Sequence, residues 1–467
     1  MTVTDTQNMI RDIMDQLYED GSFLPEETGE IRKRLFESGK EILTTTDKVI
    51  KSYIRVTRDD RSIERIPAFR VQHNNIAGFY KGGIRYNEVV NEQEVENLAV
   101  LMTLKNALHE LPYGGGKGGV VISPDQYSRR ELYMIAKKYV QRFVRDIGPT
   151  HDIPAPDMGT DAETMDWMVG EYKTINPGEN YLGSFTGKSV ENGGARGRRE
   201  STGKGTYRSY LWLLDTWVRQ TNRNSVAEGL HRDQYDRMKR LIEKHDEGKA
   251  ITLAVQGFGN VGAVAAEMAA TCDRLNHRVT AVSDQYVTLY HENGLDVRAL
   301  AGYQRRMRHL PQTAEALEEA GIQAEVRDRD ELIYLDVDVL ILAAVEDVIH
   351  GNNVDRIHAD IIVEGANAPV DGEADRVLHE QGKVVIPDVL ANAGGVMVSY
   401  VEWKQDRVTE LFSEEQVIRE MYEQMEASCE KVFDSYFTDG LPGIRNSCYV
   451  HALKRLFILH YRHGKLY

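Results

Sequence analysis

Residues 251–270 read ITLAVQGFGNVGAVAAEMAA, and this stretch decides the fold of the middle of the chain. Gly257, Gly259 and Gly262 stand in GxGxxG spacing, directly after an apolar run and directly before a helical one. Such glycines allow a tight turn, bring the backbone close to a pyrophosphate and let a helix pack closely on a strand. The phosphates then lie at the helix N-terminus. The spacing therefore predicts a dinucleotide-binding turn.

A second apolar run, RVTAVSD, follows this helix and ends in Asp284, 22 residues past Gly262. A carboxylate at that place can accept a hydrogen bond from a ribose hydroxyl and would repel a 2′-phosphate. No Arg or Lys occurs in the QYVTLY that follows, so NAD is favoured over NADP. The alternative for Asp284 is a cap or turn residue. The predicted cofactor-binding residues of this region are Gly257, Gly259, Asn260, Val261, Gly262 and Asp284.

Short apolar runs alternate with helical segments from residue 251 to about residue 394. This alternation is typical of βαβ units and predicts an α/β, Rossmann-like doubly wound domain. The first part of the chain has another pattern. Helical residues 5–45 precede strand-like runs over 52–57 and 65–75, and a helical run over 94–111 follows them. This mixture predicts a separate α/β domain, with helices again after residue 400.

The stretch LPYGGGKGGVVISP at 111–124 surrounds Lys117 with five glycines. Because glycine lets a ligand approach the backbone closely, we interpret this collar as part of a site, followed by a strand over 119–123. The alternative is a surface turn with a solvated lysine. GSFTGKS at 183–189 resembles a phosphate-binding P-loop, but Gly183 and Gly187 enclose three residues where the P-loop needs four. We therefore reject a kinase or ATPase function.

Composition and charge narrow the classes of function. At 467 residues the chain has room for two domains, and 41% hydrophobic with 28% charged residues is typical of a soluble globular protein. No run approaches the roughly 18 apolar residues of a membrane helix. The formal charge of −16, without any basic block, argues against nucleic acid as a partner. With no basic leader and apolar core at the N-terminus, we expect a cytoplasmic protein. Cys272, Cys429 and Cys448 lack metal or disulfide spacing, so we expect no metal.

Several further motifs occur together and in order: KGGIRY (81–86), TLKNAL (103–108), PYGGGKGG (112–119), IPAPDMGT (153–160), STGKG (201–205), VEGAN (363–367) and LANAGGVMVSYVEW (390–403). With QGFGNVG, they resemble the glutamate dehydrogenase (Glu/Leu/Phe/Val dehydrogenase) family from about residue 30 to the C-terminus. The resemblance implies that Lys117 is the catalytic lysine and Asp157 the catalytic acid/base. It implies that Lys105 binds the substrate α-carboxylate and that Lys81 and Ser399 bind its side-chain carboxylate. Thr202 and Asn367 would lie near the nicotinamide, although Asn367 alternatively caps a turn.

These residue types suit the oxidation of an amino acid at Cα, in which nitrogen loses a proton, carbon loses a hydride and water attacks the imine. A carboxylate beside a lysine can carry the proton. Three lysines in one pocket repel one another, and burial lowers lysine pKa values further, so we expect one with a depressed pKa and favour Lys117. The Lys81 and Ser399 pair favours an acidic substrate, because a buried cation without a partner disfavours leucine or phenylalanine.

Two departures from the family stand out. Met102 occupies a position where some members carry a glutamine that contacts the α-carboxylate. Residues 217–250 are longer than the usual link; they are either a solvated extra helix or a regulatory or subunit contact.

The resemblance implies a substrate-binding and oligomerisation domain over 1–200, joined by C-terminal helices 395–467, and an NAD-binding Rossmann domain over 201–394. Substrate would bind in the cleft between them. The expected activity is reversible oxidative deamination of L-glutamate to 2-oxoglutarate and ammonia with NAD, in a homohexamer. The alternatives are a dehydrogenase of leucine, phenylalanine or valine, and a catalytically inactive regulator that senses NAD or glutamate.

Overall fold

The computed structural model describes residues 2–178 and 180–467, which divide into two compact units. The first unit contains the chain up to residue 198 together with residues 396–417 and 449–467. The second contains residues 199–395 and 418–448. The sequence analysis assigned all of residues 395–467 to the first domain. The structure differs for residues 418–448, which pack in the second unit.

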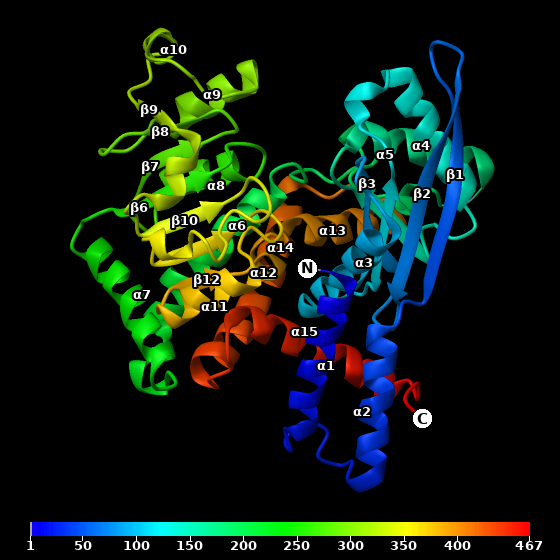
Figure 1. Cartoon of the computed structure of the whole chain (residues 1–467), viewed down its shortest axis with the longest axis horizontal. Coiled ribbons are helices and arrows are strands. Elements are labelled where there is room, and N and C mark those ends of the chain that lie inside the picture. The colour runs from blue at the N-terminus through cyan, green and yellow to red at the C-terminus, as the bar shows by residue number, and fades with distance from the viewer. Residues whose placement is uncertain (1, 179) are drawn as a thin grey trace. The chain divides into compact units, whose positions relative to one another are not determined.

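The first unit is built on a five-stranded sheet of strand order β1-β2-β4-β3-β5, of which Figure 1 labels β1, β2 and β3. β1, β2 and β4 are antiparallel neighbours, whereas β3 runs parallel to both β4 and β5. Helices α4 and α5 bury an apolar core against one face of the sheet, and α3 packs against the other. The bounds are α1 (Val3–Glu19), α2 (Gly29–Thr44), β1 (Lys48–Thr57), β2 (Ile63–Asn74), β3 (Tyr80–Tyr86), α3 (Glu92–Leu108), β4 (Gly115–Val120), α4 (Arg129–Phe143), β5 (Asp152–Pro156) and α5 (Ala162–Ile175).

The glycine run is itself a strand. The sequence analysis treated GGGKGG as a collar and expected the strand over 119–123, but β4 begins at Gly115 and ends at Val120. Glycine is a poor strand former because it has no side chain to pack. Here both neighbours, β2 and β3, pair with β4 and every residue of β4 is buried. Tertiary pairing therefore overrides the weak local preference.

The second unit is built on a seven-stranded sheet of strand order β12-β11-β10-β6-β7-β8-β9. The five strands from β12 to β7 are parallel, as the βαβ alternation predicted. β8 and β9 pair antiparallel at the edge, which the sequence analysis did not anticipate. The bounds are α6 (Ser201–Leu211), α7 (Leu230–Asp246), β6 (Ile251–Gln256), α8 (Gly262–Ala270), β7 (His277–Ser283), β8 (Val287–Tyr290), α9 (Val297–Met307), α10 (Ala314–Glu319), β9 (Glu325–Asp328), β10 (Val339–Leu342), β11 (Ile361–Glu364), α11 (Gly372–Glu380), β12 (Val384–Ile386) and α12 (Asp388–Ala391).

Three C-terminal helices follow: α13 (Gly394–Val408), α14 (Glu414–Phe433) and α15 (Ile444–Arg462). Most of α14 belongs to the second unit because it packs on α6. A side chain at Gly205 of α6 would lie 3.2 Å from the sulfur of Met425, so the two helices lie very close. Arg208 of α6 donates from Nε to Glu426 of α14 over 2.6 Å. Close packing and an ion pair thus bring this segment to the second unit.

The long link at 217–250 contains α7, and one face of this helix is buried. Tyr235, Met238, Leu241 and Ile242 are buried along it, and Lys244 forms an ion pair with Asp338 over 2.5 Å. In Figure 1, α7 lies on the opposite side of the strands from α9 and α10. The extra helix is therefore packed into the second unit along one face, and its other face is exposed in the single chain.

Candidate active site

Glycines in β4 make room for an arginine that crosses the sheet of the first unit. A Cβ at Gly116 or Gly118 would lie only 3.2 or 3.3 Å from the Arg70 guanidinium. Arg70, on β2, passes over β4 to donate to the carbonyl of Gly82 on β3 (3.1 Å) and from Nε to Asp152 on β5 (2.8 Å). Arg70 and Asp152 are both fully buried. Gly116 and Gly118 are thus explained by this buried pair. The pair links β2 to β5 on the face of the sheet opposite Lys117.

The opposite face of β4 lies directly under α3. A Cβ at Gly115 would collide with the backbone of α3 at Ala99 and Thr103. Side chains alternate along a strand, so Lys117 is on the same face as Gly115. Lys105 lies on α3, two residues beyond Thr103, and is half-buried. The close approach of helix and strand therefore places both lysines on one side of the sheet.

Lys117 forms an ion pair with Asp157, just past the end of β5. Lys117 is only 7% exposed. A Cβ at Gly83 would lie 2.7 Å from the Asp157 Cβ, so this glycine of β3 lets the acid sit against the strand. Burial opposes the charged form of Asp157, but Lys117 and Arg85 together hold its pKa below the ordinary value. Asp157 is therefore an ionised carboxylate at neutral pH, and the two cations that keep it ionised also make it a weak base.

Lys81, on β3, is a buried ammonium group. It is 1% exposed and has no hydrogen-bond or ion-pair partner within residues 2–178 and 180–467. Burial, with the charges of Arg70 and Arg198, lowers the pKa of Lys81 to about 7. A depressed pKa was predicted for one of the three lysines, and Lys81 has one because it is deeply buried and has cationic neighbours.

Ser399 lies on α13 and is 2% exposed. Val396 and Trp403, one turn to either side of it, pack with Tyr113 and Ile153. Ile153 is the register partner of Lys81 across β3 and β5. Because positions three and four apart share one face of a helix, Ser399 faces the part of the sheet that carries Lys81. The first unit therefore brings Lys81, Lys105, Lys117, Asp157 and Ser399 to one side of its sheet.

In the second unit the GxGxxG turn has the geometry that a dinucleotide needs. Gly257 has φ +86°, and a Cβ there would lie 2.8 Å from the backbone of Ala343. A Cβ at Gly262 would collide with the carbonyl of Gly257, whereas Gly259 faces open space. Chain order reverses between β6 and β10, so this turn lies at the switch point of the sheet, where ligands of such folds bind. α8 begins at Gly262 and directs its N-terminus there.

Two other predicted residues lie beside this turn, Thr202 in the first turn of α6 and Asn367 on a loop. Thr202 precedes Gly203, whose Cβ would lie 2.5 Å from the carbonyl of Val261. Asn367 lies in the loop after β11, and Asn392 donates from Nδ2 to its Oδ1 over 2.9 Å. A Cβ at Gly365, in the same loop, would lie 3.1 Å from the Val261 side chain. The structure therefore groups Thr202, Val261 and Asn367 within the second unit.

Asp284 is at the end of β7 as predicted, and it also serves as a turn residue. Its Oδ1 accepts from the backbone N–H groups of Tyr286 (2.8 Å) and Val287 (3.0 Å). Its Oδ2 accepts from the N–H of Leu310 over 2.7 Å. A carboxylate has about four acceptor positions, so one remains for a ribose hydroxyl.

A cationic cavity of about 390 Å³ adjoins the GxGxxG turn. Three arginines contribute to its wall, and one of them, Arg305, forms an ion pair with Glu267 over 2.8 Å. The cavity is lined by Arg199, Gly259, Asn260, Gln304, Arg305 and Arg308.

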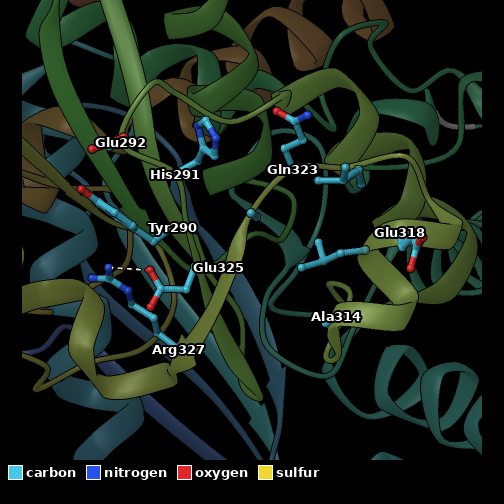
Figure 2. A pocket seen from close by; sticks show the side chains of 11 residues that line it. Tyr290, His291, Glu292, Ala314, Glu318, Gln323, Glu325 and Arg327 are labelled. Carbon is cyan, nitrogen blue, oxygen red and sulfur yellow. Dashed lines mark hydrogen bonds and ion pairs between the residues drawn. The ribbon is translucent and has the colours of Figure 1, made fainter.

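A larger open depression, of about 770 Å³, lies elsewhere in the second unit, between α10 and the edge strands β8 and β9 (Figure 2). Its wall includes Glu318, Glu325 and Arg327, and Figure 2 shows the last two paired, over 2.7 Å. None of the predicted site residues lines it. In the described parts of the chain, no group of three or more His, Cys, Asp and Glu side chains is placed to hold a metal ion. No helix there is long and apolar enough to cross a membrane.

Comparison with known proteins places the chain in a family. Residues 46–174 match the family model described as "Glu/Leu/Phe/Val dehydrogenase, dimerisation domain", and residues 236–464 match "Glutamate/Leucine/Phenylalanine/Valine dehydrogenase". The NAD-specific glutamate dehydrogenase A of Halobacterium salinarum is 34% identical over 461 residues, 99% of this chain and 94% of that protein. The chain belongs to this dehydrogenase family.

Other members agree in sequence and fold. The NADP-specific glutamate dehydrogenase of a Synechocystis species is 37% identical, over 86% of this chain and 87% of that protein. The crystal structure of the hetero-hexameric glutamate dehydrogenase of Thermus thermophilus, in its Leu bound form, superposes with a TM-score of 0.77 at 28% identity. The superposition covers 92% of this chain and 95% of the Thermus thermophilus chain. The chain is thus an oxidoreductase of the glutamate dehydrogenase family, with the α/β two-domain fold that the sequence predicted.

Some residues of the site were missed by the sequence analysis. Arg85, whose Nε is 3.5 Å from Asp157 Oδ2, lies two positions after Gly83 and hence on the same face of β3. Period-two alternation in KGGIRY was the signal that could have found it. Arg70 and Asp152 had no such signal, because their pairing depends on which strands become neighbours.

Proposed function

We propose that the chain catalyses the reversible oxidative deamination of L-glutamate to 2-oxoglutarate and ammonia, with hydride transfer to NAD. The observation that carries this proposal is Lys81. A buried ammonium group without an anionic partner is unfavourable, and a substrate that supplies a carboxylate relieves that penalty. Leucine, phenylalanine and valine supply none at the side-chain position.

The resemblance to the family gives the other side chains their proposed roles, and the charges of these groups suit those roles. Lys105 binds the α-carboxylate, and Lys81 and Ser399 bind the side-chain carboxylate. Asp157 accepts the proton that leaves the substrate amino group, because Lys117 and Arg85 keep it ionised. When water attacks the imine carbon, one of its protons passes to the nitrogen, which leaves as ammonia, and Lys117 favours this proton loss because a nearby cation stabilises the oxygen that remains. The coenzyme, when bound, accepts the hydride from Cα.

The second unit fits a nicotinamide dinucleotide. The open side of Gly259 and the N-terminus of α8 suit the pyrophosphate, and the remaining acceptor position of Asp284 suits the ribose. Thr202 and Asn367 would contact the nicotinamide side. By this proposal, residues 201–394 form the NAD-binding domain, and residues 1–200 with C-terminal helices form the substrate-binding and oligomerisation domain.

NADP is the second candidate coenzyme, and the arginine-lined cavity favours it. Arg199 and Arg308 adjoin the same turn as Asn260, although they lie far from it in sequence. A 2′-phosphate there would gain cationic partners that the sequence after Asp284 does not offer. We expect kcat/KM to be higher with NAD than with NADP, and Arg308→Gln to widen that difference. A higher kcat/KM with NADP would overturn the choice of coenzyme.

A comparison of glutamate with leucine tests the substrate assignment. Wild type should turn over glutamate with the higher kcat/KM, and Lys81→Ala should lower that value by about 100-fold while leaving leucine turnover unchanged. Equal loss for both substrates would favour another amino-acid dehydrogenase. Binding of glutamate and NAD without any turnover would favour the inactive regulator.

We also propose a homohexamer, as the matched dimerisation domain and the hexameric relative suggest. β1 is a ten-residue edge strand whose Val49 and Tyr53 are more than one-third exposed. A long exposed edge of this kind is suited to pairing with another chain. Light scattering should give about six times the 53.0 kDa of one chain, and a monomer mass would contradict the proposal.

A further inference from the structure

The GSFTGKS turn, which is not a P-loop, holds a buried acid of α13. The backbone N–H of Gly187 donates to both carboxylate oxygens of Glu402, each over 2.9 Å. Lys188 donates to Glu402 Oε1 from its backbone N–H (3.3 Å) and from Nζ (2.8 Å). Lys188 and Glu402 are both fully buried. The turn thus cradles a carboxylate of the protein itself.

The Lys188 ammonium group has a complete set of acceptors. Besides Glu402, it donates to Asp406 Oδ2 (2.7 Å) and to the carbonyl of Phe185 (2.7 Å). Burial, with the charge of Glu402, raises the pKa of Asp406 to about 7, although Lys188 opposes this shift. One cation therefore faces two acidic groups inside the first unit, and Asp406 is partly protonated at neutral pH.

This cluster adjoins the proposed substrate residues. Glu402 follows Ser399 by three positions, so both lie on one side of α13. The charged groups around Lys81 come from four segments: Arg70 on β2, Asp152 on β5, Arg198 and Glu402. Arg70 is already paired with Asp152. Glu402 is thus the remaining anion near Lys81, and its charge also acts on Arg198 and on the hydroxyl of Tyr113.

We propose that Glu402 is a positioning and specificity-determining residue: clamped by Lys188 and the GSFTGKS turn, it fixes Ser399 of α13 beside Lys81 and favours the charged form of Lys81 that binds the side-chain carboxylate of the substrate.

This inference rests on the proposed function and deepens it. Two cations near Lys81 disfavour its charged form, and only a charged Lys81 binds a carboxylate as an ion pair. Glu402 opposes that repulsion from a fixed position. It does not itself neutralise Lys81 by contact, because its oxygens are occupied by Lys188 and Gly187. Lys81 therefore stays available to the substrate.

Glu402→Gln tests the proposal because glutamine keeps the size of the side chain and an acceptor for Gly187 but removes the charge. The pH above which the KM for glutamate begins to rise should move down by about one unit, since an opposite charge nearby shifts a pKa by about that amount or more. At pH 8 the KM should then be about tenfold above wild type. At pH 6 it should approach wild type, and kcat at saturating glutamate should change far less.

Glu171→Gln is the matched control, since Glu171 is also a buried acid of the first unit and pairs with Lys137 over 2.9 Å. It should leave the pH dependence unchanged. Glu402→Asp keeps the charge and should keep the wild-type pH profile, and it remains informative if Glu402→Gln does not fold.

Three results would overturn the inference. They are a wild-type pH profile in Glu402→Gln, a KM raised equally at every pH, and a shifted profile in Glu402→Asp. Any of these leaves the glutamate activity of wild type standing, whereas a wild type inactive on glutamate refutes the proposed function as well.

Discussion

At the scale of single residues, two charged groups on one face of the sheet, Asp157 and Lys81, have opposite environments. Asp157 is ionised because Lys117 pairs with it and Arg85 lies 3.5 Å away. Lys81 is destabilised as a cation because it is buried near Arg70 and Arg198. The first arrangement keeps a carboxylate ionised beside a lysine. The second arrangement, at Lys81, suits a group that binds an anion.

The low pKa of Lys81 predicts proton uptake on binding. In the free protein Lys81 is charged below pH 7 and increasingly neutral above it. A bound carboxylate raises this pKa again, so binding of glutamate at pH 8 should take up about one proton, and binding at pH 6 almost none. Calorimetry in two buffers of different ionisation enthalpy measures this uptake. Lys81→Met should abolish it, and uptake that is equal at both pH values would rule out Lys81 as its source.

At the scale of elements, α3 lies close to β4 because the glycines of β4 have no side chains to hold the helix away. Gly115→Ala would push α3 away, because the new Cβ would meet helix backbone that cannot rotate aside. We expect a loss of about 1–3 kcal/mol in unfolding free energy, with a raised KM for glutamate because Lys105 moves with α3. Urea unfolding and steady-state kinetics measure both.

Gly170→Ala, in α5 of the same unit, is the matched control. Nothing lies within 4 Å of its added Cβ, so it should gain about 0.5–1 kcal/mol from helix propensity. If Gly115→Ala were as stable as wild type, the close approach of α3 and β4 would not control this site.

Prediction from the sequence succeeded where a local pattern carries the information. The apolar run before Gly257 gave β6 with the same bounds, and the βαβ alternation gave the parallel strands. Prediction failed where contacts with residues distant in sequence determine the structure. β4 forms within glycines because β2 and β3 pair with it, and β8 and β9 are short strands that only their neighbours stabilise. The burial of Lys81 depends likewise on residues from other strands.

At the scale of the whole chain, Arg445 adds charged contacts between the C-terminal segment 418–448 and the rest of the second unit. Arg445 donates to Glu364 (2.6 Å) and to Asp388 (3.1 Å). Glu364 is fully buried at the end of β11, directly before the loop with Asn367. Burial raises the pKa of Glu364 to about 8, and Arg445 opposes that shift. Arg445 therefore links the C-terminal segment to the loop after β11, which carries Asn367 and is proposed to contact the coenzyme.

Arg445→Met should lower the free energy of unfolding by about 3 kcal/mol at pH 8, because buried Glu364 loses its partner. The loss should be smaller at pH 6, because below its pKa of about 8 Glu364 is mainly protonated in wild type too, so the variant loses less of an ion pair there. Urea unfolding at the two pH values measures it. Arg376→Met breaks an exposed pair with Glu380 and should change stability by no more than about 0.5 kcal/mol. A similar small effect for Arg445→Met would refute the link.

The most direct test of the whole account is the rate of NADH formation from glutamate and NAD by Asp157→Asn. Asparagine keeps the size of the side chain but cannot accept the proton. The account predicts a fall in kcat of about a thousandfold, while glutamate still raises the thermal stability of the variant as it does that of wild type. A kcat within tenfold of wild type would show that Asp157 does not carry the proton and would contradict the assignment of this site.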